Sequence, residues 1–184
     1  MTTDKSKVTI HMVSSLDGFI AKKDGTVSWM RSDDNYEKGI MLTNEYIAEF
    51  LKSIDCYVMG SKTYEHALEL GWPYGKKPVF VVTNNKLVTD KENVEFCSGE
   101  LDKIINDKLK PNYKNIWMVG GSKLTKESIK LGLADKIVLT ITPIILGDGI
   151  LFFDYIGKEY LLHLEDVMAF KDGMVELCYK IKKE

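Results

Sequence analysis

Two glycine-broken junctions in this chain have the residue types and spacing that bind a phosphate group. In the first, the apolar run 116–119 ends at Gly120 and Gly121, and Ser122 opens an amphipathic segment. A helix that starts directly after a strand presents unpaired N–H groups and the positive end of its dipole, and glycines let a phosphate approach the backbone. The pattern indicates a pyrophosphate site; an ordinary strand-to-helix turn is the alternative for this motif alone.

The second junction follows the same plan. The apolar run 56–59 ends at Gly60, and Ser61, Lys62 and Thr63 lead into a second amphipathic segment. Two hydroxyl donors and one positive charge at a helix start suit a phosphate group better than a glycine pair does alone. The sequence therefore contains two strand-to-helix junctions in one domain that each have the features of a phosphate site.

Polar side chains also follow a third apolar run. Thr83 and Asn84 come directly after the β-branched run 79–82, which is typical of a parallel strand covered on both faces. Open α/β sheets bind their ligands at the carboxyl ends of such strands. We therefore expect Thr83 and Asn84 at the same edge of the sheet as the two junctions.

Two carboxylates are candidates for proton transfer or ligand contact. Glu45 lies four residues before Glu49 on a predicted helix, and this spacing is equally typical of a solvated helix face. Asp17 precedes Gly18 after the apolar run 8–16, where a carboxylate usually caps the backbone N–H groups of a turn. Both residues are retained as catalytic candidates beside these structural alternatives.

Length and composition limit the classes of protein that this chain can belong to. The 184 residues are 45% hydrophobic and 28% charged, which predicts one compact domain over residues 1–184. A net charge of −2 without basic runs disfavours nucleic acid as a partner. Three scattered cysteines without a CxxC pair argue against a metal cluster and for reduced thiols in the cytoplasm. No apolar run is long enough to cross a membrane, and we expect no domain ahead of the first strand, because only residues 1–7 precede it.

The order of the predicted elements indicates the fold class. Strands and helices alternate through the first two thirds of the chain, with a helix over 101–109 and a long strand over 136–145, in which Pro143 removes a ladder donor and indicates a bulge or the strand end. The segments 163–167 and 174–181 have the alternation and Asp-Gly turn of an antiparallel hairpin. The pattern predicts an α/β protein of three layers, with a central mixed, mainly parallel sheet, flanking helices and a C-terminal antiparallel hairpin.

The first predicted helix carries Glu45. Ser32 or Asp33 can cap its start, and apolar residues at helical spacing are expected to form a buried face through about residue 54. These residues are Tyr46, Ile47, Phe50, Leu51 and Ile54.

Six stretches in order over nearly the whole chain resemble the dihydrofolate reductase fold. They read SSLDGFIA, VMGSKTYE, VFVVTN, WMVGGSKL, LTITPIILGDG and FFDY. The SxDG opening and the TPxxLGxG stretch are most similar to the reductase domain of riboflavin biosynthesis and its stand-alone relatives. These motifs are specific for the fold and much less specific for the substrate, because related enzymes perform several reductions on one cofactor frame.

The resemblance implies NADPH as cofactor. It places the adenosine 2′-phosphate near Ser61, Lys62 and Asn84, and the pyrophosphate between the helix starts at Thr63 and Ser122. It also implies that the nicotinamide lies beside Val13, Ile20 and Gly120, and that a cis peptide joins Gly120 to Gly121. The full set of expected cofactor-binding residues is Val13, Ile20, Gly60, Ser61, Lys62, Thr63, Thr83, Asn84, Val119, Gly120, Gly121, Ser122, Lys123 and Leu124.

Departures from the family pattern separate its activities. A folate reductase pairs its pterin with a carboxylate on the first helix and clamps the folate carboxylate with an arginine; here Asn44 or Glu45 stands at the first position and Lys76 at the second. Lysine cannot supply the planar fork of that clamp. We expect direct hydride transfer from NADPH to a C=N carbon of a small heterocyclic substrate, such as a ribosylaminopyrimidine phosphate, with a proton from water or Glu45. The alternatives are a dihydrofolate reductase and an NADPH-binding module without turnover.

The TPxxLGxG region also predicts self-association. Apolar residues surround the turn at Gly147, and the runs 144–146 and 150–153 carry more apolar surface than a turn should expose. We expect a homodimer that buries Leu151 and Phe152; the alternative is that both side chains enter the core of their own protomer.

Overall fold

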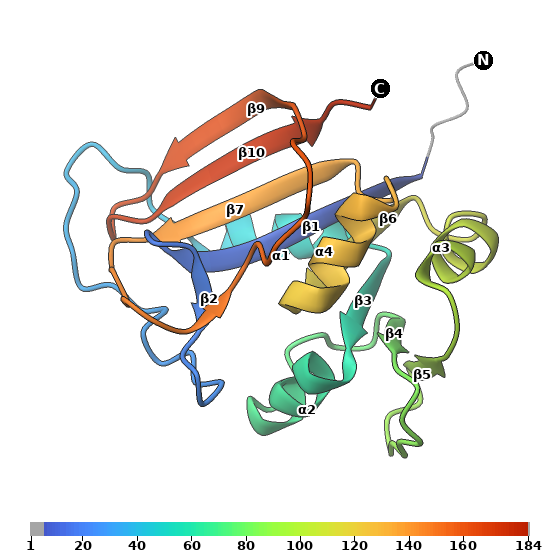
Figure 1. The fold of residues 1–184 in the computed structure, drawn as a ribbon. Helices are drawn as coiled ribbons and strands as arrows, with labels where there is room; N and C mark the ends of the chain where they lie inside the picture. The colour runs from blue at the N-terminus through green and yellow to red at the C-terminus, as the bar shows by residue number, and fades with distance from the viewer. Residues whose placement is uncertain (1–5, 184) are drawn as a thin grey trace.

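A computed structural model describes residues 6–183, and its centre is an eight-stranded sheet in the order β5-β4-β3-β6-β1-β7-β10-β9 (Figure 1). Six of these strands, β1 and β3 to β7, run parallel to their neighbours, and β10 and β9 add an antiparallel hairpin. The predicted mixed, mainly parallel sheet is confirmed. The sheet strands are β1 (Lys7–Ser15), β3 (Cys56–Gly60), β4 (Val79–Val82), β5 (Val94–Cys97), β6 (Asn115–Gly120), β7 (Lys136–Thr142), β9 (Leu162–Ala169) and β10 (Val175–Ile181). A separate pair is formed by β2 (Phe19–Ala21) and β8 (Ile150–Leu151).

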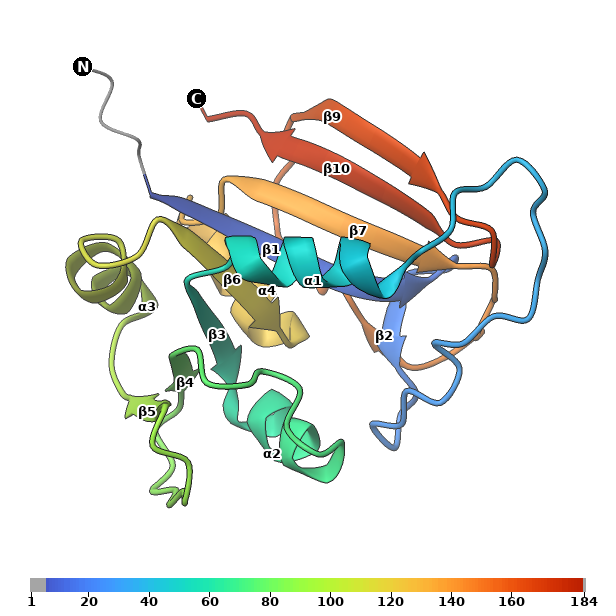
Figure 2. The same ribbon diagram turned by 180° about the vertical axis from the view of Figure 1, so that it is seen from behind.

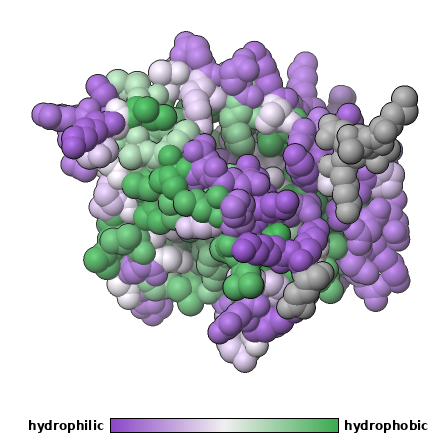
Figure 3. Space-filling model, turned by 90° about the horizontal axis from the view of Figure 1, so that it is seen from above, coloured by the Kyte–Doolittle hydropathy of each residue, from purple (hydrophilic) through white to green (hydrophobic). Residues whose placement is uncertain are grey.

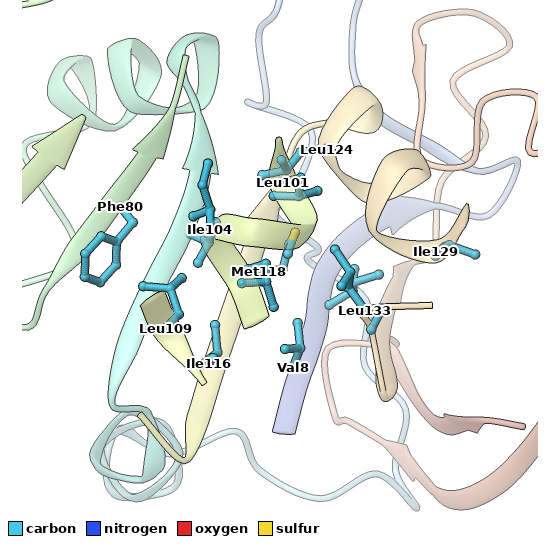
Figure 4. Close-up of a cluster of buried hydrophobic side chains, with 14 of the residues drawn as sticks. Val8, Phe80, Leu101, Ile104, Leu109, Ile116, Met118, Leu124, Ile129 and Leu133 are labelled. Carbon is cyan, nitrogen blue, oxygen red and sulfur yellow. The ribbon is translucent and has the colours of Figure 1, made fainter. Parts of the chain in front are cut away.

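Helices cover both faces of the sheet, which gives the predicted three layers. Helix α1 (Asn44–Ser53) lies on one face and α4 (Ser122–Lys130) on the other, as the opposite views of Figures 1 and 2 show. The α4 face holds the larger core, in which residues of β1 and β6 such as Val8, Ile116 and Met118 pack against Leu124 and Ile129 of α4 (Figure 4). The remaining helices are α2 (Ser61–Glu69), α3 (Leu101–Lys103) and η1 (Ile104–Leu109).

The helix predicted over 101–109 is present, but its hydrogen bonding changes along its length. Leu101–Lys103 is α-helical, and Ile104–Leu109 continues as a π-helix. Its apolar residues Leu101, Ile104, Ile105 and Leu109 all enter the core on the α4 face. No described helix is both long and apolar enough to span a membrane.

Two expectations about the first helix are wrong. Its N-cap is Thr43, whose hydroxyl accepts a hydrogen bond from the N–H of Tyr46, and neither Ser32 nor Asp33 caps it. The segment before Thr43 instead pairs with the hairpin: the N–H of Tyr36 donates to the carbonyl of Lys171. No residue within α1 is fully buried, because only the C-terminal half of the helix packs closely on the sheet; of the predicted face, only Ile54 at the C-cap is buried.

The expected place of Phe152 in a dimer interface is also wrong. Its side chain is 1% exposed and lies in the core on the α4 face, together with Ile20 and Leu124. The N–H of Phe152 donates to the carbonyl of Gly18, which fixes this residue against the turn between β1 and β2. Its neighbours Leu151 and Phe153 are exposed.

Candidate functional site

The two glycine-broken junctions lie side by side in the structure. The N–H of Gly121 donates to the hydroxyl of Thr63 across a distance of 3.1 Å, which joins the start of α4 to the start of α2. Strands β3 and β6 are parallel neighbours, so both helix starts leave the same edge of the sheet. The arrangement therefore places two helix N-termini, and the positive ends of two dipoles, next to each other.

Neither helix start is closed by a side chain of the described residues. Gly60 precedes α2, Gly121 precedes α4, and no side-chain hydrogen bond caps either helix. A Cβ at Gly60 would meet no atom within 4 Å, and a Cβ at Gly121 would meet only the hydroxyl of Thr63 at 3.6 Å. The Gly120–Gly121 peptide is cis, as the resemblance implies. This open pair of starts has the geometry of an anion site.

The other predicted phosphate-binding residues surround these starts. Gly60 pairs with Val82 in the β3–β4 ladder, so Thr83 and Asn84 follow directly beside the start of α2. Lys62 and Lys123 occupy the second position of α2 and α4, and both are exposed. Neither lysine forms an ion pair with any residue between 6 and 183, so both ammonium groups are available to an anion.

Three predicted cofactor-binding side chains serve packing instead. Ile20 and Leu124 are buried in the core on the α4 face, and Val119 packs against the smaller core on the α1 face. The side chains of Ile20 and Leu124 are therefore closed off in the core, whereas that of Val119 remains partly exposed. The predicted set thus combines groups that face outward at the sheet edge with side chains that hold that edge in place.

Asp17 joins two motifs that are far apart in the sequence. Its carboxylate accepts hydrogen bonds from the hydroxyl of Ser15 and from the N–H groups of Leu146 and Gly147. These bonds, above all the one from Ser15, hold the pKa of Asp17 below its usual value. The carboxylate thus connects the SxDG turn to the TPxxLGxG loop, and both of its oxygens already accept hydrogen bonds there.

Glu45 is exposed at the first turn of α1. The N–H of Glu45 itself, followed by the hydroxyl of Thr43, lowers the pKa of its carboxyl group. A general acid at neutral pH needs a raised pKa, so this environment works against proton donation by Glu45. Water is the better proton source for the predicted reduction.

A polar cluster that the sequence analysis does not single out lies on the sheet face beneath α1. The hydroxyl of Thr140 donates to Glu176 at 3.1 Å, and His11 Nε2 lies 3.5 Å from the same carboxylate oxygen. The neighbouring imidazole of His11 is the largest influence that lowers the pKa of Glu176. Each residue interrupts the apolar pattern of its strand, and this interruption is the one signal in the sequence that points to them.

A pocket of about 350 Å³ lies beyond the end of β7. It is lined by Arg31, the only arginine of the chain, by three residues that follow it and by Thr142, Pro143 and Ile144. The hydroxyl of Thr142 is buried without a hydrogen-bond partner in residues 6–183. The same part of the chain holds no group of three or more residues that would suit a metal ion.

The chain is similar to known proteins over nearly its full length. The family model of the RibD C-terminal domain matches residues 6–175. The Bacillus subtilis protein YwjB, described as uncharacterized, is 32% identical, with 94% of this chain and 97% of YwjB covered.

Solved structures agree with these sequence matches. A putative riboflavin biosynthesis protein from Shewanella sp. PV-4 is 26% identical and superposes with a TM-score of 0.82, covering 96% of this chain and 99% of that protein. The Thermotoga maritima diaminohydroxyphosphoribosylaminopyrimidine deaminase/5-amino-6-(5-phosphoribosylamino)uracil reductase has the same fold at 16% identity, with a TM-score of 0.69 over 98% of this chain and 58% of its own length. The dihydrofolate reductase-like fold and the family match lead to one assignment: this chain belongs to the RibD C-terminal domain family.

Proposed function

We propose that this protein is an NADPH-dependent reductase that transfers a hydride to a C=N carbon of a small aminopyrimidine-type substrate. The observation that carries this proposal is the hydrogen bond between Thr63 and Gly121, which sets two open helix starts side by side at the carboxyl edge of the sheet. One dinucleotide bridges such a pair through its pyrophosphate. The family match supports reductase chemistry.

The residues at this edge fit the proposed cofactor. The N–H groups at the starts of α2 and α4 would hold the pyrophosphate, and Gly60 and Gly121 leave room for it. Lys62 and Asn84 are exposed beside the start of α2, where a 2′-phosphate would meet a positive charge and an amide. When bound, NADPH supplies the hydride; the chain supplies binding, orientation and exclusion of water.

Positioning would account for most of the rate acceleration. Asp17 keeps the loop at Leu146 and Gly147 against the β1–β2 turn, which fixes the backbone near the expected nicotinamide position at Val13. Because Glu45 is exposed and its pKa is lowered, the proton that completes the reduction comes from water in this proposal. Arg31 is the candidate cation for a phosphate on the substrate, although Asp33 and Asp34 line the same pocket.

The role of Lys62 tests the choice of cofactor. Lys62→Ala is expected to weaken NADPH binding by about 1–3 kcal/mol, the range for a hydrogen bond to a charged group, and to leave NADH binding nearly unchanged. Isothermal titration calorimetry with both cofactors measures this difference. Lys123→Ala is the matched control, since Lys123 holds the same position on α4; it should affect both cofactors alike. Equal losses for NADPH and NADH in Lys62→Ala would remove Lys62 from the 2′-phosphate.

A nucleotide-binding module without turnover is the second candidate function. The exposure and lowered pKa of Glu45 favour it, because no general acid is evident at that position. NADPH binding without oxidation across pyrimidine, pterin and quinone substrates would support this alternative. Binding of an antifolate would instead support a folate reductase.

We further propose that the protein forms a homodimer in the cytoplasm. Strand β9 is an open edge of the sheet, and Leu162, Leu164 and Val167 are exposed on it; Figure 3, which looks down on this edge, shows a hydrophobic patch bordered by hydrophilic residues. Leu151 is exposed beside β2 and remains a second candidate contact. All three cysteines are free and buried, which supports a reducing compartment.

Light scattering at micromolar concentration tests the dimer, and a dimer mass is expected. Val167→Glu should give a folded monomer if the β9 edge forms the contact, because a buried, unpaired charge opposes association. Leu151→Glu should do so if the surface at β8 forms it. A monomer mass for the unmodified protein would disprove both contacts.

A further inference from the structure

The register of three strands brings a single row of side chains together on the α1 face. Val13 of β1 pairs with Thr140 of β7, and Thr140 pairs with Glu176 of β10. His11 lies two residues before Val13 and therefore on the same face of β1. The row thus runs from the expected nicotinamide position at Val13 to the carboxylate of Glu176.

Within residues 6–183, only one of the two carboxylate oxygens of Glu176 contacts neighbouring side chains. Among the described residues, the hydroxyl of Thr140 donates to Oε2 at 3.1 Å and His11 Nε2 lies 3.5 Å from the same oxygen, whereas no such contact is seen at Oε1. Oε1 therefore keeps its lone pairs for another donor. The side chain of Glu176 is 14% exposed, so the carboxylate is recessed but not sealed.

Aromatic side chains hold His11 in place, and His11 in turn favours the charged form of Glu176. His11 stacks on Trp117 at 5.1 Å, and Phe50 of α1 meets the edge of the imidazole at 4.9 Å. The lowered pKa of Glu176, caused first by His11, keeps the carboxylate ionised at neutral pH. Phe50 packs on the sheet, whereas Tyr46, one turn earlier in α1, is 40% exposed. The C-terminal half of α1 therefore covers His11, and the N-terminal half is more open to solvent.

We propose that Glu176 is the substrate-recognising carboxylate of this protein, and that its Oε1 accepts hydrogen bonds from N–H groups of the substrate heterocycle. His11 and Thr140 are positioning residues, because they hold Oε2 and thereby orient Oε1. This assignment rests on the proposed function, since it places the heterocycle beside Val13. An ionised carboxylate with a free oxygen selects a ring that offers N–H or amino donors, and it disfavours rings that offer only acceptors.

Binding of an aminopyrimidine tests the assignment directly. The probe is 5,6-diaminouracil, which carries ring N–H and amino donors, and calorimetry measures its affinity with and without NADPH. Glu176→Gln keeps the size of the side chain and removes the charge; it is expected to weaken probe binding at least tenfold and to leave NADPH binding unchanged. Glu49→Gln, on the exposed face of α1, is the matched control and should bind the probe normally. Equal affinity of Glu176→Gln and the unmodified protein, or no binding to the unmodified protein, would overturn the proposal.

Variants of Thr140 separate positioning from a merely structural role. Thr140→Val removes the hydroxyl at nearly constant volume and is expected to weaken the probe several-fold, whereas Thr140→Ser keeps the hydroxyl and should restore binding. In the double variant Thr140→Val/Glu176→Gln the loss should not exceed that of Glu176→Gln alone, because both changes act on one carboxylate. Additive losses would show that Thr140 acts independently of Glu176.

The two proposals fail in different ways. If the protein binds the probe through Glu176 but does not bind NADPH, the proposed reductase function is wrong and the proposed recognition site is supported. If NADPH binds and the affinity for the probe does not depend on Glu176, the proposed recognition site is wrong and the proposed cofactor site is supported.

Discussion

Replacing Phe152 with alanine is expected to lower the free energy of unfolding by about 3–5 kcal/mol, the usual cost of removing a buried phenylalanine side chain. The side chain is 1% exposed and fills the space between β2 and the core that α4 covers. Its loss removes apolar contacts and leaves a cavity in this core, and both effects destabilise the folded state. Urea denaturation monitored by circular dichroism measures the change.

Phe153 provides the control for this experiment. It lies next in the chain, its ring is 4.1 Å from that of Phe152, and it is 41% exposed. Phe153→Ala is therefore expected to cost only about 1 kcal/mol. If Phe152→Ala is as stable as the unmodified protein and only its oligomeric state changes, Phe152 belongs to an interface and its position in the core is wrong.

The sequence could not decide the position of Phe152 because the deciding contact is distant. The run 150–153 is apolar throughout, so periodicity does not separate inward from outward side chains. Strand β8 has two residues, and its register is set by pairing with β2, about 130 residues earlier in the chain. Only this pairing assigns Phe152 to the core and Leu151 to the surface.

The strand-to-helix units were predictable because their signals are local. The run 56–59 and the run 116–119 each end at a glycine before a polar helix start, and the structure has β3–α2 and β6–α4 there. The hairpin of β9 and β10 follows equally from alternation and an Asp-Gly turn. In each case a few neighbouring residues carry the whole signal.

The segment before α1 was mispredicted because its partners lie in the hairpin. Ser32 and Asp33 are good helix caps by residue type, but the backbone near Gly39 packs on the carbonyl of Phe170, where a Cβ would collide. Ile40 forms an isolated bridge with the same residue. Because of these long-range contacts, the helix begins only after Thr43. No local sequence pattern indicates the contacts.

The candidate site also combines features that local sequence signals predict with features that depend on long-range contacts. The glycines and hydroxyls of both junctions predict phosphate sites from the sequence alone, whereas the contact between Thr63 and Gly121 depends on the order of the strands. His11, Thr140 and Glu176 stand in three separate strands, and each one alone reads as a polar residue in an apolar run. The sheet register turns them into one cluster.

Replacing Gly121 with alanine is expected to abolish most NADPH binding while the fold survives. Its φ is −41°, and an added Cβ would meet only the Thr63 hydroxyl, at an ordinary contact distance of 3.6 Å. A pyrophosphate drawn to the N–H groups of α2 and α4 must approach this same backbone, and the methyl group would hold it away. We expect at least a hundredfold loss of NADPH affinity, about 2.7 kcal/mol, in calorimetry.

The neighbouring glycine provides the contrast that makes this experiment decisive. Gly120 has a φ of +104°, and an added Cβ would lie 2.5 Å from the terminal carbon of Met12, so Gly120→Ala is expected to lower the melting temperature. Gly121→Ala should melt within a few degrees of the unmodified protein, a change of less than about 1 kcal/mol. A Gly121→Ala variant that melts lower but binds NADPH normally would show that the glycine pair is a packing turn. The cofactor would then have to bind away from the two helix starts.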